Sequence, residues 1–196
     1  MAVGRRPRMM VALAAALVGL FVFAASSPGS SRDRRVRIKD DCDAASFNAF
    51  GNSVGLGDLC AGQGDTTFAD FIAQVAAHRP PHKWRFDRKK FNLKAGGKIS
   101  VVNKGGEFHT FTEVAQFGGG CFKALNDLLG LTPVPECGGV IIDPPNALTP
   151  PAAFGTSGVA PLGGTLTVTG LSPGIHRFEC LIHPWMRSTV KVRSHH

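Results

Sequence analysis

The sequence predicts an all-β fold, a sandwich or barrel of short strands, and two groups of residues carry that prediction. From Trp84 to Val114, short runs of alternating apolar and polar residues are separated by glycine pairs. From Leu166 to Val192 the same pattern returns, with glycine and proline between the runs. Short strands with this turn spacing are typical of β-sandwiches and barrels.

The first 26 residues have the pattern of a secretory signal peptide. Arg5, Arg6 and Arg8 precede an apolar run from Met9 to Ala25, which ends among small residues. The run is shorter than the roughly 20 residues of a membrane-spanning helix, which favours cleavage over anchoring. We therefore expect an exported protein, periplasmic, cell-surface or secreted, that touches a membrane only if this segment is retained.

Two further segments precede the predicted strands. Residues 27–41 are rich in serine, glycine and charge, so we expect a flexible linker. Residues 42–83 are expected to form an N-terminal extension with one short helix. The helix is predicted because apolar residues recur at helical spacing from Phe68, between an N-cap offered by Asp65–Thr67 and the Pro80-Pro81 pair.

The remaining residues, 84–196, are expected to form the strand-rich domain. Its two strand groups are joined by an elaborated connection, residues 118–164, which contains a second short helical pattern at Phe122–Leu129, closed by Gly130.

The chain has five cysteines, and an odd number in an exported protein leaves one thiol for another role. Cys180 is the odd one by its context. The other four allow three pairings, of which proximity favours Cys42 with Cys60 and Cys121 with Cys137. The second pair would pin the connection. Free buried thiols are the alternative that an oxidising compartment disfavours.

The net charge is +8, with basic clusters at Arg32–Lys39 and Arg79–Lys94. A solvated face is the favoured interpretation of these clusters, ahead of an acidic partner or an anionic surface. No basic motif is interleaved with aromatic residues, so nucleic acid is not an expected partner.

The loop before the last predicted strand carries the candidate chemistry. Cys180, His183 and Met186 lie within seven residues. Thiolate, imidazole and thioether together suit copper, whereas hard cations prefer carboxylates. A blue copper site needs two histidines, one thiolate and a weak axial methionine, so one histidine must come from elsewhere. His109, which starts a strand-like run after a glycine turn, is the candidate.

These motifs resemble the cupredoxins, the plastocyanin and azurin family, and among them the amicyanin and pseudoazurin type. The copper loop is Cys-x-x-His-Pro-x-Met at 180–186, and Phe91–Asn103 is similar to the strand, glycine turn and strand that lead to the family's first histidine. The resemblance covers about residues 84–114 and 164–193. Ser188 and Thr110 depart from it, where the family often has glycine and asparagine.

The resemblance implies a Greek-key β-sandwich that holds one copper ion. His109 and His183 would bind through ring nitrogens, Cys180 as thiolate and Met186 as the long axial ligand. It also implies one-electron transfer between Cu(I) and Cu(II) with redox partner proteins, no enzymatic activity and a monomer. Trp185 is expected on an apolar surface patch around His183, where a partner would dock.

Other functions compete with this interpretation. Envelope copper storage or delivery could use the same site, but three of the four methionines lie at 1, 9 and 10, in the leader. A Cys180–His183 nucleophile lacks an orienting group, and zinc would replace Met186 with a cysteine, histidine or carboxylate. A multicopper oxidase needs more histidines than the seven present. An interaction module with structural or lost copper remains a third hypothesis.

Overall fold

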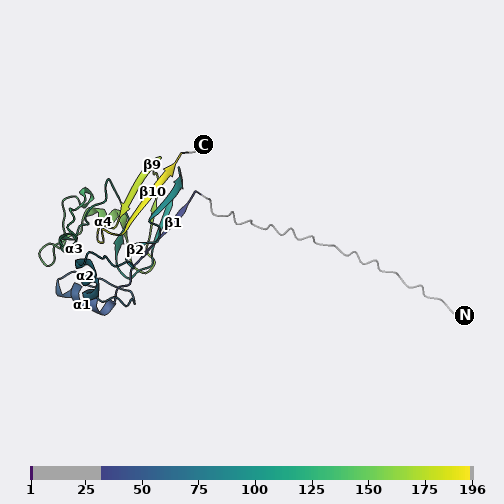
Figure 1. The fold of residues 1–196 in the computed structure, drawn as a ribbon. Helices are drawn as coiled ribbons and strands as arrows, with labels where there is room; N and C mark the ends of the chain where they lie inside the picture. The colour runs from purple at the N-terminus through teal and green to yellow at the C-terminus, as the bar shows by residue number, and fades with distance from the viewer. Residues whose placement is uncertain (2–31, 195–196) are drawn as a thin grey trace.

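The computed structural model describes Met1 and residues 32–194, and two packed sheets form its centre (Figure 1). The first sheet contains β1 (Arg34–Lys39), β2 (Arg85–Phe86), β4 (Ile99–Asn103) and β8 (Thr165–Val168), in the order β2-β1-β4-β8. The second contains β3 (Lys90–Lys94), β6 (Thr112–Val114), β9 (Gly174–Glu179) and β10 (Arg187–Arg193), in the order β3-β10-β9-β6. These two packed sheets confirm the prediction of a β-sandwich.

Both sheets are mixed, because β1 runs parallel to β4 and β3 runs parallel to β10, while the other pairs are antiparallel. Burial alternates along β4 and β10, as expected for strands with one face on a core. Inward side chains from both sheets join one buried cluster, which includes Val36, Ile38, Ile99, Val101, Leu93, Phe178, Val190 and Val192. The sandwich is therefore held by one continuous apolar core.

Residues 34–39 correct the expectation of a flexible linker over 27–41. This segment is β1, an inner strand of the first sheet, and Val36 and Ile38 on it are fully buried. Arginines and a lysine alternate with these two residues, so the charged side chains point away from the core. The sandwich thus begins at β1 and not at residue 84. The predicted signal peptide and the first part of the predicted linker lie outside the described residues.

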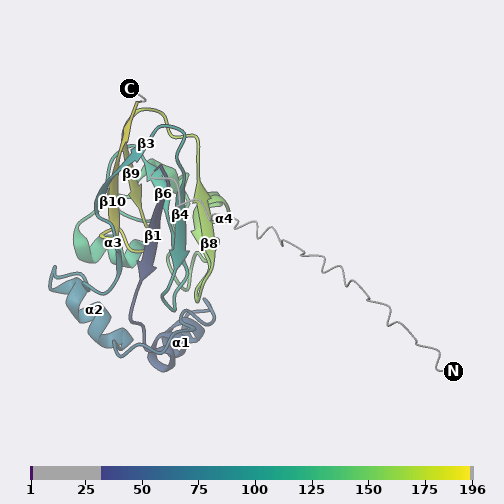
Figure 2. The same ribbon diagram turned by 90° about the vertical axis from the view of Figure 1, so that its right-hand side faces the viewer.

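Residues 42–83 form two helices, not the one expected. They are α1 (Ala44–Ser53) and α2 (Phe68–Ala76), and both lie at the end of the sandwich opposite to the end of β10 (Figure 2). The N-cap expected within Asp65–Thr67 is Thr67, whose side chain accepts from the Asp70 N–H. The sequence pattern missed α1 because glycine, asparagine and serine interrupt its apolar face. Gly51 is nevertheless required there, since an added Cβ would lie 2.2 Å from the Gly57 carbonyl oxygen.

The connection between the strand groups holds α3 (Lys123–Leu129), a 3-10 turn η1 (Pro135–Cys137) and α4 (Ala152–Ser157). The predicted helix and its Gly130 cap are confirmed for α3. The connection ends in β7 (Gly158–Val159), which pairs with β5 (His109–Thr110). The expected all-β fold is therefore incomplete, because four α-helices accompany the strands in the part of the chain that the structure describes.

Both disulfides join the pairs favoured by proximity in the sequence, Cys42–Cys60 and Cys121–Cys137. The first joins the residue just before the N-cap of α1 to the segment between α1 and α2. In that segment the Ala61 N–H donates to the Gly106 carbonyl, in the turn before β5, at 2.8 Å. The second pins the connection, as predicted. Two disulfides are consistent with an exported protein. Within residues 32–194, no helix has the length and apolar character that crossing a membrane requires.

Candidate metal centre

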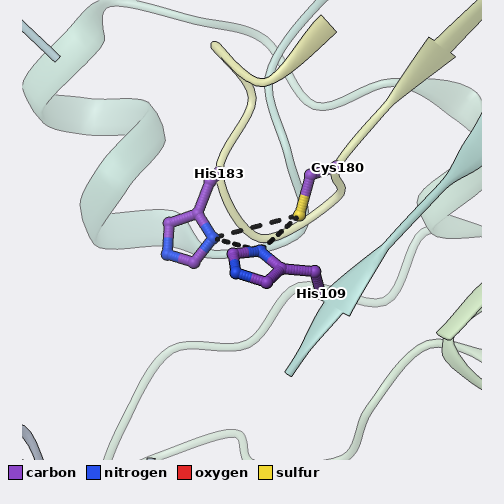
Figure 3. A group of neighbouring side chains, drawn as sticks. All are labelled: His109, Cys180 and His183. Carbon is purple, nitrogen blue, oxygen red and sulfur yellow. Dashed lines mark hydrogen bonds between the residues drawn. The ribbon is translucent and has the colours of Figure 1, made fainter. Parts of the chain in front are cut away.

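Three side chains from separate parts of the fold meet at the end of the sandwich nearest α2 and α3. His109 is the first residue of β5, Cys180 directly follows β9, and His183 lies in the loop between β9 and β10 (Figure 3). All three are buried. Within residues 32–194, Cys180 is the only cysteine without a disulfide. The predicted odd cysteine is thus the free thiol, and two predicted histidines flank it.

The three donor atoms form a compact triangle. Cys180 Sγ lies 3.6 Å from His109 Nδ1 and 3.9 Å from His183 Nδ1, and the two nitrogens are 3.3 Å apart. The centre of the circle through these atoms lies about 2.1 Å from each of them, in the range of metal–nitrogen and metal–sulfur bonds. Two imidazoles and one thiolate in this arrangement are the in-plane donors of a blue copper site. The residues therefore fit one copper ion.

Met186, the predicted axial ligand, is buried in the same loop. Its N–H donates to the His183 carbonyl at 2.9 Å, and its carbonyl accepts from the Cys180 N–H at 3.1 Å. These two hydrogen bonds close the loop on itself, so Met186 is fixed relative to both other loop residues. Its role as axial ligand stays a prediction.

Asp40 holds the far side of the His109 ring. Its Oδ2 lies 2.8 Å from His109 Nε2, and the N–H groups of Gly106 and Glu107 donate to the same carboxylate at 2.8 and 3.1 Å. Burial opposes ionisation of Asp40, but the His109 and backbone hydrogen bonds outweigh it and lower its pKa. Asp40 thus leaves Nδ1 of His109 directed at Cys180. A carboxylate in this position fixes the ring of a metal-binding histidine.

Glu107 and aromatic side chains surround His183. Glu107 Oε1 lies 3.8 Å from His183 Nε2, while its other oxygen accepts from Trp84 Nε1. Burial raises the pKa of Glu107 to about 8, although the charge of His109 opposes this. The rings of Phe71 and Trp185 lie edge-on to His183, with centroids 5.8 and 5.4 Å away.

The expected docking patch around His183 is not at the surface. The residue is 2% exposed, because Phe71 of α2 lies over the region where the sequence predicted a partner to dock. Trp185 is itself partly buried against the same core. The extension before β2, which lies outside the motif that suggested the patch, supplies this cover.

The protein's own charges favour a deprotonated Cys180. Burial alone would raise the thiol pKa, but hydrogen bonding to His109 and the charge of His109 outweigh it and lower that pKa. Burial likewise opposes protonation of His109, but the Asp40 and Cys180 hydrogen bonds raise its pKa to about 10. Burial and the nearby His109 keep the pKa of His183 well below its usual value. The thiolate and neutral His183 are the forms that bind a metal.

Thr110 connects β5, which carries His109, to the loop that carries Cys180 and His183. Its Oγ1 accepts from the Leu181 N–H at 2.8 Å, and its own N–H points at Cys180 Sγ at 3.5 Å. The sequence departs from the family pattern at Thr110, yet its hydroxyl tethers the loop to β5. Ser188, the other departure, is buried on β10 and donates to the Arg88 carbonyl.

Sequence reasoning missed Asp40 and Glu107. Asp40 lies inside the expected linker, and Glu107 lies between the predicted glycine turn and His109, where no sequence pattern marks it. The alternation of apolar and basic residues over Arg34–Lys39 is the signal that predicts a strand ending beside Asp40.

No protein-family model matches the sequence, and no curated protein matches it significantly. Among solved structures, the chain is similar to a purple cupredoxin from Nitrosopumilus maritimus, with 14% identity and a TM-score of 0.37 over 82% of this chain and 100% of that chain. The chain is also similar to amicyanin from Paracoccus versutus, with 17% identity and a TM-score of 0.33 over 58% of this chain and 76% of that chain. A mutant plastocyanin of a fern is similar to it with 14% identity and a TM-score of 0.33, over 56% of this chain and 89% of that chain. Similarity at this level carries no argument about function, which must come from the site itself.

Proposed function

We propose that this protein is an exported, type 1 copper-binding electron carrier with the Greek-key fold of the cupredoxins. The observation that carries the proposal is the buried triangle of His109, Cys180 and His183 donor atoms, with sides of 3.3 to 3.9 Å. Its donor set is soft and suits copper better than hard cations or structural zinc. Met186 is proposed as the weak axial ligand.

Bound copper would supply a one-electron change between Cu(I) and Cu(II). The chain's own residues keep the donor atoms in place for both states. Asp40 and Thr110 fix His109 and the loop through hydrogen bonds of 2.8 Å each. The three donor residues are buried against the core and α2, which keeps the donor atoms in place. Such a fixed, buried centre supports electron transfer without chemistry on a substrate, and we propose no enzymatic activity.

Copper storage or delivery is the competing function for the same residues. Handing copper to another protein requires that a ligand be reached from outside. His109 and Cys180 are fully buried and His183 is 2% exposed, which favours electron transfer over delivery. We propose redox proteins as the partners of a monomer, with no role for nucleic acid.

The test is the visible and electron paramagnetic resonance spectra of the protein with Cu(II), beside a Cys180→Ser variant. We expect an intense blue thiolate band that disappears in this variant and persists in His176→Gln, a control outside the triangle. A colourless protein, or copper binding untouched by Cys180→Ser, would overturn the proposal.

A second measurement separates the two functions. We expect a strong Cu(I) chelator to remove copper slowly, while a small redox reagent cycles the protein quickly. Rapid loss of copper to the chelator with slow redox cycling would favour delivery instead.

A further inference from the structure

An apolar cavity of about 350 Å³ lies beside the metal centre, between the N-terminal helices and the connection. Its walls include Phe50 of α1, Phe68 of α2, Phe122 at the start of α3 and Phe154 of α4. A cavity of this size, with apolar walls and a few converging polar groups, is the common form of a small-molecule site.

Two polar side chains that line the cavity lie close together but form no hydrogen bond with each other. Glu107 Oε1 and His183 Nε2 are 3.8 Å apart, beyond hydrogen-bond range, and both residues line the cavity. The other Glu107 oxygen is already used by Trp84. Asp58, a further acidic residue on the lining, already accepts from Asn52 Nδ2 at 2.9 Å. Glu107 and His183 are therefore the pair with which a bound molecule can interact.

The gap between these two atoms suits a hydroxyl group. A hydroxyl has one donor and two acceptor positions, so it can bridge two groups that stand slightly too far apart to bond directly. It can pair with His183 Nε2 whether or not that nitrogen carries a proton, because it can accept or donate. The same argument excludes purely apolar molecules as the best occupants, since they would leave Glu107 Oε1 without a partner.

The aromatic walls suit a flat ring. Phe50 and Phe68 stack with centroids 3.9 Å apart, and Phe108 lies 6.0 Å from Phe154. Phe108 is 37% exposed, so its ring borders both the cavity and solvent. Its position depends on Gly158, where an added Cβ would lie 2.3 Å from the Phe108 ring. Aromatic rings pack favourably against such walls in offset or edge-to-face contacts.

We propose that this cavity binds a small aromatic compound of one or two rings that carries a hydroxyl group. The ring lies among the phenylalanines, and the hydroxyl lies between Glu107 and His183. The binding does not rest on copper, because every group that it uses belongs to the chain. Its failure and the failure of the proposed copper function are therefore distinguishable.

The test compares 2-naphthol with naphthalene, which lacks only the hydroxyl, on the full chain without added metal. Calorimetry or chemical-shift titration is expected to give one site, with naphthol bound at least tenfold more tightly than naphthalene. Equal affinities, or no saturable binding of naphthol, would overturn the proposal.

A pair of variants locates the site. Ile72→Trp adds a large side chain on the cavity wall, whereas Ile175→Trp makes the same change at a position 51% exposed on β9. Naphthol affinity is expected to fall at least tenfold in the first and to stay unchanged in the second. If Ile72→Trp does not fold, ring-proton shifts in the wild type decide. Shifts at the wall rings Phe50, Phe68, Phe122 and Phe154 support the site, and shifts confined to rings outside the cavity contradict it.

Discussion

Asp40 Oδ2 lies 2.8 Å from His109 Nε2, and both side chains are buried, at 2% and 0% exposure. Asp40 follows directly after β1, and His109 opens β5, so the contact joins residues that are 69 positions apart. A negative charge on the outer nitrogen of a histidine makes the inner nitrogen a stronger donor to a metal. The first sheet thereby influences a ligand that belongs to another part of the fold.

Asp40→Asn is expected to raise the reduction potential of bound copper. The amide keeps a similar shape but removes the charge that stabilises Cu(II) more than Cu(I). Loss of such an outer partner typically costs about 10- to 100-fold in metal affinity. A tenfold loss confined to Cu(II) corresponds to roughly 59 mV for a one-electron couple. Voltammetry and a Cu(II) affinity titration would measure both effects.

Asp41→Asn is the matched control for this change. Asp41 pairs with Lys83 Nζ at 2.6 Å, with Thr66 Oγ1 at 2.7 Å and with the Asp65 N–H at 3.3 Å, whereas His109 pairs with Asp40. The reduction potential of copper bound to this variant should stay close to that of the wild type. An equal rise in both variants would mean that general charge, and not the contact with His109, sets the potential.

Thr110→Val is expected to destabilise the protein by about 1–3 kcal/mol, because it leaves the buried Leu181 N–H without an acceptor. Valine has nearly the same shape as threonine, so the effect reports the lost hydrogen bonds of the hydroxyl, which accepts from the Leu181 N–H at 2.8 Å and from the Thr112 hydroxyl at 3.1 Å. Urea unfolding would measure it, with Thr167→Val on the exposed side of β8 as control. Equal stabilities of the two variants would show that the tether contributes nothing.

The strands and the residues that meet at the candidate metal centre were predictable because their signals are local. Cys180, His183 and Met186 lie within seven residues, and their combined chemistry indicates one class of metal site. His109 follows a glycine turn at the start of a strand pattern, so its direction could be inferred without knowing its neighbours. The favoured disulfide pairs also joined the cysteines nearest in sequence.

The features that the sequence did not reveal depend on contacts between distant segments. Arg34–Lys39 has only two apolar residues among its charges, and its place between β2 and β4 becomes clear only once the sheet is assembled. The same is true of α2, which was predicted as a helix but not as the cover of His183. Asp40 and Glu107 could not be assigned to the histidines before these segments were placed.

Ile38→Ala tests whether β1 belongs to the core. Ile38 is fully buried in the first sheet, so truncation is expected to lower the free energy of unfolding by about 2–5 kcal/mol. Arg35→Ala, on the exposed side of the same strand, should change it by no more than about 0.5 kcal/mol. Denaturant unfolding of both variants provides the comparison. A flexible linker would make the two substitutions equally harmless.

His176 is expected to make stability depend on pH. Burial opposes its protonation, but Glu113 Oε1 at 2.6 Å and the Ser172 carbonyl at 2.8 Å outweigh this and raise its pKa above 6.5. The folded state therefore holds the proton more tightly than the unfolded state. This contribution is fully present below pH of about 6.5 and is lost as pH rises through the folded pKa.

Urea unfolding from pH 5 to 9 should show His176→Gln losing most stability at the acid end, while His82→Gln, at an exposed position, follows the wild type. A stability difference for His176→Gln that stays constant or grows with pH would contradict this account of the His176–Glu113 pair.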